Sequence, residues 1–406
     1  MSAPVASFEA ALEFARDLIR IPSLSGNEGE AAECVREEFV RLGFEDTRID
    51  EVGNVVGVIP GQAGGPRVML CSHLDVVAAG DAETWEYPPF AGAVAEGYLH
   101  GRGAMDIKGP LAIQTHAAAA LRGRAPGDVI VAHTVFEERG GLGAQYLFES
   151  LEVLPDAVVI GEATHGDICI GHRGRAEVEI VIRGIAGHAS APSRAQNPLS
   201  LLPAVLEACR ELTGDQPSDP HLGPATVAPT SVEVLPETRN VIPDQVTVVL
   251  DWRTLPGATE QVLLDRVRRA VGQRLTELPE GYGLDVRMAR ERHNTYTGVE
   301  REWPMLSPGF LLSPEHAVAR AAAEAVGSRD GNDGPATIRP WMFATDGGWT
   351  CGVHGVPTIG FAPGEERHAH TNRERLSLGE ARWSLERYPG LVLAVQSALG
   401  SAAGNE

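Results

Sequence analysis

Two adjacent glutamates, Glu137 and Glu138, follow the apolar stretch VIVAHTVF near the middle of the chain. Burying one carboxylate at the end of a strand costs free energy unless the group is paired or binds a metal. Here two acids occur together, one residue before a Gly-Gly turn, so the pattern predicts a site whose chemistry uses both.

Further histidines and acids follow other apolar segments. They are His73 and Asp75 after VMLCS, Asp106 in HGRGAMDIKG, Glu162 after VVIG, and His368 and His370 in FAPGEERHAHTNRE. In an open α/β sheet the carboxyl ends of the strands meet at one crevice, where ligands bind. Imidazole nitrogens and carboxylate oxygens are ligands for Zn²⁺, Co²⁺ and Mn²⁺. Two histidines with three or four carboxylates exceed the needs of one tetrahedral ion and suit two ions about 3.5–4 Å apart that share a carboxylate.

In their order and approximate spacing, these segments resemble the co-catalytic metallohydrolase family of acetylornithine deacetylase, succinyl-diaminopimelate desuccinylase, aminoacylase and glutamate carboxypeptidase. The resemblance covers nearly the whole chain. It is carried by SHLDVVAAGDAETWEYPPF, GRGAMDIKG, the Glu-Glu pair, the Gly-Glu-Ala at 161–163 and AHTNRE. Any one of these segments alone is a weak signal, whereas their combination is specific.

The resemblance implies two divalent ions per subunit, with zinc favoured and cobalt or manganese as alternatives. It implies the following ligands: His73 and Glu162 for one ion, Glu138 and His370 for the other, and Asp106 as the bridge between them. The pattern Ala-His-x-x-x-Glu selects His370 over His368. Some dipeptidases and tripeptidases of the family have aspartate at the position of Glu162, so a glutamate there favours the deacylase and carboxypeptidase branches.

The resemblance also implies two features beside the ligands. Asp75 is expected behind His73, where it orients the ring and raises its basicity. The peptide bond between Asp106 and Ile107 is often cis in the family.

The two glutamates are expected to have different roles, because successive side chains diverge at a strand end. Glu138 binds the metal and Glu137 faces the bridging water. Two metals lower the pKa of that water from 15.7 toward about 7, so Glu137 can act as general base.

Three residues of a later segment match further family positions. His188 in GIAGHASAPSRAQNP resembles a lid histidine that reaches in from the partner subunit and stabilises the oxyanion. Asn240 and Arg253, in TRNVIPDQVTVVLDWR, match positions that hold a substrate carboxylate, a task suited to the bidentate fork of arginine. The alternative for Arg253 is a structural salt bridge, for example with Asp251.

Hydrophobic patterning shows which elements must position these residues. Up to about residue 174, short apolar runs such as RVMLCSH and DVIVAHTVF alternate with helical patterns, which predicts an open, mostly parallel α/β sheet flanked by helices. After that point, RAEVEIVIRG and QVTVVLDWR alternate apolar and polar residues, as antiparallel strands with one wet face do. We therefore expect a zinc-exopeptidase-like catalytic domain at 1–174 and 293–406, and an inserted α+β lid and dimerisation domain at 175–292.

Composition limits the partners and the compartment. The net charge of −21 argues against nucleic acid and anionic membranes. No apolar run approaches the ~18–20 residues of a membrane span, and the charged residues within the apolar pattern of 1–23 predict an amphipathic helix instead of a signal peptide. The five cysteines are scattered and form no C-x-x-C pair, which predicts free thiols and a reducing, cytoplasmic location.

Nucleotide-binding and serine-hydrolase sites are excluded because the chain lacks their complete motifs. HGRGAMDIKG has Gly101 and Gly103 but Asp106 where a dinucleotide fingerprint needs its third glycine, and it lacks the Gly-Lys-Ser/Thr of a phosphate loop. The chain has no Gly-x-Ser-x-Gly elbow. The remaining histidines are interpreted as structural: His100, His116, His133, His165, His172, His221, His293, His316 and His354.

The sequence thus predicts a cytoplasmic, homodimeric, metal-dependent amidohydrolase that cleaves the amide bond of a small N-acyl amino acid or related compound through a hydroxide bridging two metals. Two alternatives remain open. One is an exo-acting carboxypeptidase or dipeptidase on the same scaffold, which would take a small peptide. The other is a non-catalytic binding or regulatory relative, and the presence of Glu137, all five ligands and His188 argues against it.

Overall fold

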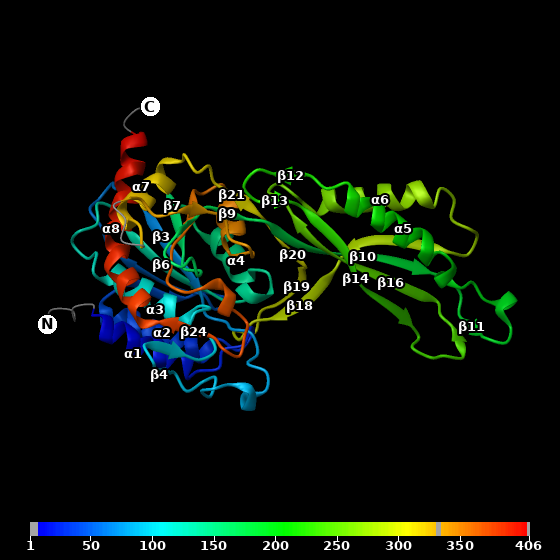
Figure 1. The fold of residues 1–406 in the computed structure, drawn as a ribbon, viewed down its shortest axis with the longest axis horizontal. Coiled ribbons are helices and arrows are strands. Elements are labelled where there is room, and N and C mark those ends of the chain that lie inside the picture. Colours follow the sequence, from blue (N-terminus) through cyan, green and yellow to red (C-terminus); the bar gives the residue numbers. More distant parts are fainter. Residues whose placement is uncertain (1–6, 330–333, 404–406) are drawn as a thin grey trace. The chain divides into compact units, whose positions relative to one another are not determined.

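The computed structural model describes residues 7–329 and 334–403 of the chain, and these residues divide into two compact units (Figure 1). Unit 1 comprises Met1–His172, His293–Arg301 and Leu311–Glu406, and unit 2 comprises Arg173–Arg292 and Glu302–Phe310. Unit 2 differs from the predicted insert at 175–292 because it starts two residues earlier and includes Glu302–Phe310. Glu302–Phe310 belong to unit 2 because Leu306 and Ser307 pair with the first residues of a long strand of that unit.

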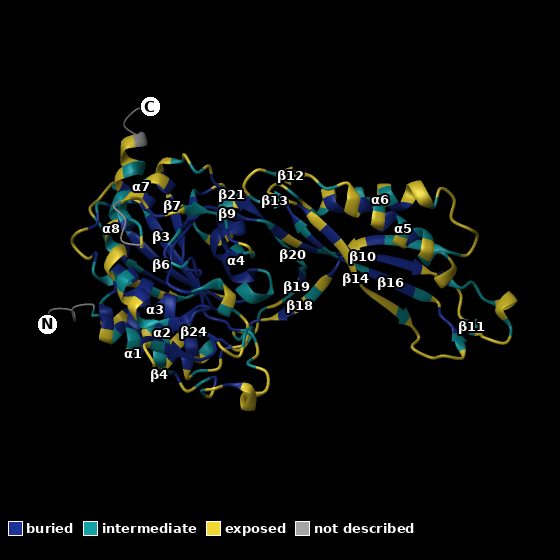
Figure 2. Cartoon of the chain, viewed as in Figure 1, coloured by how far each residue is buried: buried dark blue, intermediate teal, exposed yellow. Residues whose placement is uncertain are grey.

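Unit 1 is built on a mixed eight-stranded sheet with the order β1-β2-β6-β3-β7-β23-β8-β22. The strands are β1 (Glu45–Ile49), β2 (Val55–Ile59), β3 (Val68–His73), β6 (Val129–Thr134), β7 (Ala157–Ile160), β8 (Ile168–Cys169), β22 (Ile338–Arg339) and β23 (Thr358–Gly360). The four central strands β6, β3, β7 and β23 are parallel. Every residue of these strands is buried (Figure 2), which explains their continuous apolar sequences. The predicted α/β class is confirmed.

Helices pack against this sheet and against one another. They are α1 (Phe8–Ile19), α2 (Gly29–Leu42), α3 (Lys108–Ala119), α4 (Leu142–Ser150), α7 (Ala317–Val326) and α8 (Leu378–Ala403). Helix α3 contacts β3, β6, α1 and α8, and nearly all of its residues are buried, so its small alanines allow close approach on every side. Pro110 is its third residue, where no intrahelical hydrogen bond is lost. Among the described residues, no helix combines the length and apolarity needed to cross a membrane.

The parallel register brings the carboxyl ends of the central strands to one edge. His73 at the end of β3 pairs with Thr134 at the end of β6, and Cys71 pairs with Ile160 at the end of β7. β6 ends sooner than its apolar pattern predicts. Phe136 adopts a left-handed conformation with φ 58°, and Glu137–Arg139 form a 3-10 turn. The two glutamates therefore point differently because of this turn, and the predicted divergence along an extended strand is not the reason.

Unit 2 is an antiparallel sheet with the order β14-β16-β10-β17 and a short β20 beside β10. Its main elements are β10 (Gly174–Arg183), α5 (Leu202–Gly214), β14 (Thr226–Leu235), β16 (Gln245–Thr254), α6 (Glu260–Arg274), β17 (Gly283–Met288) and β20 (Leu306–Ser307). Alternate residues of β10 and β16 join residues of both helices in one hydrophobic core. The edge strand β14 is mostly exposed (Figure 2), in contrast to its neighbour β16.

Short elements complete the two units. In unit 1, β4 (Ala93–Ala95), β5 (Tyr98–His100) and β24 (Arg375–Ser377) form a three-stranded sheet. In unit 2, β11 (Gly187–His188) pairs with β15 (Val241–Ile242), and β12 (Ser218–Asp219) pairs with β13 (Gly223–Pro224). The remaining pairs are β9 (Gly171–His172) with β21 (Phe310–Leu311), and β18 (Arg290–Asn294) with β19 (Glu300–Pro304).

Candidate metal centre

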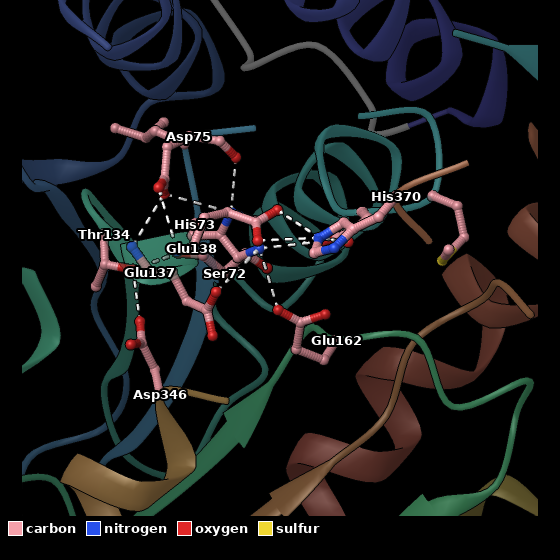
Figure 3. A network of polar contacts seen from close by, with 12 residues as sticks. Ser72, His73, Asp75, Thr134, Glu137, Glu138, Glu162, Asp346 and His370 are labelled. Carbon is pink, nitrogen blue, oxygen red and sulfur yellow. Dashed lines mark hydrogen bonds and ion pairs between the residues drawn. The ribbon is translucent and has the colours of Figure 1, made fainter. Parts of the chain in front are cut away.

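The five predicted metal ligands meet at the carboxyl edge of the unit 1 sheet. Figure 3 labels four of them: His73, Glu138, Glu162 and His370. They come from five segments: His73 ends β3, Asp106 lies in the loop before α3, Glu138 lies in the turn after β6, Glu162 lies two residues after β7, and His370 lies in the loop before β24. The Asp106–Ile107 peptide bond is cis, as the resemblance implied. His368, the rejected alternative to His370, lies in a 3-10 turn, whereas Nε2 of His370 lies beside the carboxylates of Asp106 and Glu138.

Asp106 lies between the two imidazoles. Its Oδ1 is 3.3 Å from Nε2 of His73, and its Oδ2 is 3.2 Å from Nε2 of His370. Each imidazole also faces a glutamate of its own. Nε2 of His73 is 3.1 Å from Oε1 of Glu162, and Nε2 of His370 is 3.0 Å from Oε2 of Glu138. The result is two His-Glu pairs that share one carboxylate.

Glu137 lies on the His73 side of this arrangement. Its Oε2 is 3.9 Å from Nε2 of His73, and its side chain is 13% exposed. Ligand atoms of His73, Glu137 and Glu162 all lie within 4.8 Å of one another, as do those of His73, Asp106 and Glu138. Glu137 is therefore close enough to the ligands to act on a molecule held between them.

The electrostatics reflect many acids in a buried space. Burial alone lowers the pKa of His73, but the neighbouring carboxylates of Asp106 and Glu162 outweigh burial and raise the pKa well above the usual value. Hydrogen bonds to Asp106 and Glu138 raise the pKa of His370 to about 10. Burial, and then the negative charge of Asp106, raises the pKa of Glu162 to about 7. The cluster thus attracts positive charge, which is typical of a functional site.

The donor set fits two divalent cations. Four carboxylates lie in the cluster (Asp106, Glu137, Glu138 and Glu162), and two divalent cations would balance their charge in a site where unpaired charges are costly. Imidazole nitrogens and carboxylate oxygens without a thiolate suit zinc and neighbouring first-row ions. Nε2 of His73 is shielded from solvent and makes no hydrogen bond of good geometry with any described residue, so its lone pair can serve a metal.

Asp75 supports the cluster in two ways. Its main-chain carbonyl oxygen accepts a hydrogen bond from Nδ1 of His73 at 2.8 Å, whereas its carboxylate Oδ1 is 3.5 Å from that nitrogen. The carboxylate instead accepts hydrogen bonds from the main-chain N–H groups of Glu137 (3.1 Å) and Glu138 (3.2 Å) and from the hydroxyl of Ser25 (2.7 Å). The residue does lie behind His73, as expected, but its charge mainly holds the turn that carries the two glutamates.

Two buried acids beside the cluster were not assigned from the sequence. Asp346 accepts a 2.7 Å hydrogen bond from the hydroxyl of Thr134 at the end of β6, and burial raises its pKa to about 7 (Figure 3). Glu374 accepts a hydrogen bond from the N–H of Asp106. The only sequence signals for them were an acid within the apolar stretch WMFATDGGW and the last letter of AHTNRE.

The predicted lid residues lie in unit 2, and the structure brings two of them together. His188 on β11 pairs with Val241 of β15, and the N–H of Ala189 donates to the carbonyl oxygen of Asn240 at 3.1 Å. The His188 side chain is exposed, and its Nδ1 accepts a 3.1 Å hydrogen bond from the N–H of Ser190. His188 and Asn240 therefore lie near each other in the chain fold, His188 on β11 and Asn240 directly before β15.

Arg253 does not join these two residues. It lies near the end of β16, eight residues beyond the first strand residue, Gln245. At a rise of ~3.3 Å per residue, this places Arg253 about 26 Å along the strand from the end nearest Asn240. Its Nε is 2.9 Å from Oδ1 of Asp251, which is the ion pair considered as the structural alternative.

A cluster of this composition, at the carboxyl edge of a central parallel sheet, is characteristic of dinuclear metallohydrolases. Residues 69–389 match peptidase family M20/M25/M40. The chain therefore belongs to this family and is a metallohydrolase that acts on amide bonds, as the sequence motifs predicted.

Individual relatives agree with this assignment. The chain is 30% identical over 369 residues to the uncharacterized protein YgeY of Escherichia coli (strain K12), with 89% of this chain and 88% of YgeY covered. It is 30% identical over 359 residues to a succinyl-diaminopimelate desuccinylase of Methylorubrum extorquens, with 83% of this chain and 86% of the desuccinylase covered. The YXEP protein of Bacillus subtilis, described as a dinuclear metal binding peptidase from the M20 family, has the same fold, with a TM-score of 0.69, 18% identity, and 96% of this chain and 99% of YXEP covered.

Proposed function

We propose that this enzyme removes the acyl group from a small N-acyl amino acid with the help of two divalent ions. The observation that carries the proposal is the position of Asp106 between the Nε2 atoms of His73 and His370, each of which faces its own glutamate. A glutamate at position 162 supports a deacylase or carboxypeptidase over a dipeptidase or tripeptidase, and the desuccinylase among the relatives supports the deacylase.

In this proposal His73 and Glu162 hold one ion, Glu138 and His370 hold the other, and Asp106 contacts both. When bound, such ions, with zinc favoured over cobalt or manganese, polarise a carbonyl group and lower the pKa of water. The chain prepares His73 for its role, because a carbonyl oxygen can only accept. The 2.8 Å contact with the Asp75 carbonyl therefore places the proton on Nδ1 and leaves Nε2 as the ligand atom.

Glu137 is proposed as the general base. Its carboxylate lies beside the His73 side of the cluster, and its main-chain N–H is held by the Asp75 carboxylate. In this position it can take a proton from the attacking water and return the proton to the departing amine. Glu138, in the same turn, points to His370, so one turn supplies both a ligand and the base.

Unit 2 is proposed to act as the lid and the dimerisation domain of a homodimer. In the sheet formed by the described residues, β14 is an edge strand paired only with β16, and its Val232 and Leu235 are 44% and 49% exposed. An open edge of this kind can pair with a second copy of the chain. A small substrate cannot span the ~26 Å along β16. The pair His188 and Asn240 can therefore contact the same substrate as Arg253 only if that pair comes from one subunit and Arg253 from the other.

The proposed compartment is the cytoplasm. All five cysteines are free thiols, as expected in a reducing environment. The net charge of −21 also supports a small-molecule substrate over nucleic acid or an anionic membrane surface.

A substrate panel tests this function. The purified full-length protein, supplied with Zn²⁺, Co²⁺ or Mn²⁺, is assayed against N-acyl amino acids and dipeptides. Hydrolysis confined to the N-acyl amino acids is expected. Faster hydrolysis of dipeptides would favour the carboxypeptidase or dipeptidase alternative, and a metal-saturated protein without any hydrolysis would favour the non-catalytic one.

A further inference from the structure

The buried acid Glu374 adjoins the cluster without belonging to its ligands. The residue is 1% exposed. Its Oε1 accepts hydrogen bonds from the main-chain N–H groups of Met105 and Asp106, both at 3.1 Å, and its Oε2 forms an ion pair with Nη1 of Arg102. Its carbonyl oxygen accepts a 3.3 Å hydrogen bond from the N–H of Gly101. Glu374 thus binds the 101–106 segment through both its side chain and its main chain.

Arg102 is held in place by further contacts. It is 3% exposed, and its guanidinium group lies over the ring of Trp85, 5.1 Å from the ring centre. Its main-chain N–H donates a 2.8 Å hydrogen bond to the carbonyl oxygen of Pro89. Arg102 therefore presents a fixed positive charge to Glu374 and offsets part of the free-energy cost of burying that carboxylate.

Glu374 also connects two segments that carry ligands. It follows His370 by four residues, whereas it binds the N–H of a residue 268 positions earlier in the chain. Asp106 depends on this connection, because its two oxygens must face two different histidines at 3.3 and 3.2 Å. A shift of the Asp106 main chain relative to the His370 loop would lengthen at least one of these contacts.

His73 and His370 differ in how firmly the structure fixes them apart from any contribution of Glu374. His73 ends a fully buried strand and is 1% exposed. His370 lies in a loop, its side chain is 53% exposed, and its main chain has φ 59°, a left-handed conformation that is strained for a residue other than glycine. The site formed by Glu138, His370 and Asp106 therefore depends more on outside support.

We propose that the ion pair of Glu374 and Arg102 positions ligands of the metal centre. It fixes Asp106 relative to the His370 loop and thereby sets the affinity for the ion held by Glu138, His370 and Asp106. This inference rests on the metal ligands of the proposed function. Partners behind metal ligands typically contribute 10–100-fold to metal affinity. In Glu374→Gln the size is kept, but an amide NH₂ replaces one acceptor and the charge facing Arg102 is lost. We therefore expect one ion to bind ~10–100-fold more weakly, with the other unchanged.

Metal retention by the full-length protein tests the inference. Zn²⁺ is withdrawn with a competing chelator, the two dissociation constants are measured, and the absorption spectrum of the Co²⁺-substituted protein is recorded. The variants are Glu374→Gln and Arg102→Lys, which keeps the charge but loses the planar fork. Glu38→Gln is the matched control. Glu38 is an 8% exposed acid that binds Arg41 and His116, and no contact recorded for the described residues links it to a proposed ligand.

The expected result is a selective loss of one ion in Glu374→Gln and, to a smaller degree, in Arg102→Lys, with a changed Co²⁺ spectrum. Glu38→Gln should lower the unfolding temperature and leave both dissociation constants unchanged. The inference would be overturned if both Glu374→Gln and Arg102→Lys bound metal as tightly as the wild type. It would also be overturned if Glu38→Gln, at the same loss of stability, lost as much metal affinity as these two variants. If Glu374→Gln does not fold, Arg102→Lys decides alone. A wild-type protein that binds no ions would instead refute the proposed function itself.

Discussion

Replacing Asp75 with asparagine should damage the site without removing a ligand or the base. The carboxylate uses both oxygens: Oδ1 accepts from the N–H of Glu137, and Oδ2 accepts from the N–H of Glu138 and the hydroxyl of Ser25. An asparagine side chain has one oxygen, so at least one of these donors must face an NH₂ group instead. The turn that carries both glutamates then loses part of its anchor.

The magnitude follows from the burial and charge of the group. Asp75 is 0% exposed, so water cannot replace a lost contact. A hydrogen bond to a charged group contributes ~1.5–3 kcal/mol, and a donor left buried without a partner costs ~1–3 kcal/mol. We expect the free energy of unfolding to fall by ~2–3 kcal/mol. Displacement of the turn should lower kcat ~10–100-fold, as for other partners behind a metal site.

The assay measures kcat and KM on the best N-acyl amino acid and the free energy of unfolding in urea. Asp50→Asn is the matched control, because Asp50 caps a turn in the same way. Its Oδ1 accepts from the N–H groups of Val52, Gly53 and Asn54 at 3.1, 2.9 and 2.9 Å, and its Oδ2 from the Asn54 side chain. The control should lose stability and keep its kcat. An unchanged kcat in Asp75→Asn, or an equal fall in both variants, would refute the reasoning.

Three further predictions concern the base, the dimer and acid stability. Replacing Glu137 with alanine should abolish turnover and leave the metal content of the purified protein intact; continued hydrolysis would rule it out as the base. Mixing the inactive variants His188→Ala and Glu137→Ala should restore activity, since a hybrid dimer has one site with both residues, and no recovery after subunit exchange would contradict a histidine supplied by the partner. Burial raises the pKa of Glu38, but hydrogen bonds from Arg41 and His116 outweigh it and lower the pKa to about 2, from a usual value of 4.5. The lowered pKa stabilises the fold above pH 4.5, and this stabilisation is lost as the pH falls toward 2. Between pH 4.5 and pH 2, the free energy of unfolding measured in urea should fall more for the wild type than for Glu38→Gln. Parallel curves of this free energy against pH would count against the pairing of Glu38 with Arg41 and His116.

The meeting of the ligands could be predicted from the sequence because it follows from a general property of parallel sheets. His73 and Glu162 directly follow apolar runs that are too short for helices and too continuous for exposed strands. Parallel strands place their carboxyl ends side by side, so these residues had to lie near one another. Asp106, Glu138 and His370 lie in loops or turns and were placed through the family resemblance.

Local backbone geometry was not predictable in the same way. Strand β6 ends at Thr134, and the left-handed Phe136 begins the turn that carries the two glutamates. Nothing in the sequence VFEERGG indicates that the chain turns here instead of continuing the strand. The direction of the Asp75 carboxylate depends on that turn, because its hydrogen-bond donors are the N–H groups of Glu137 and Glu138.

Long-range polar contacts were missed for a different reason. Glu374 and Arg102 are 272 residues apart, and periodicity carries no information about such a pair. The separation of Asn240 from Arg253 was missed as well. The resemblance assigned both residues to one substrate carboxylate, whereas most of the strand Gln245–Thr254 extends between them.

The proposed function requires that one carboxylate, Asp106, is shared by two metal ions. Anomalous scattering from crystals of the zinc-saturated full-length protein tests it most directly. The claim predicts two zinc peaks per subunit, ~3.5–4 Å apart, one beside His73 and Glu162 and the other beside Glu138 and His370, with an Asp106 oxygen on each. A single peak at saturating zinc, or two peaks that do not share Asp106, would contradict it.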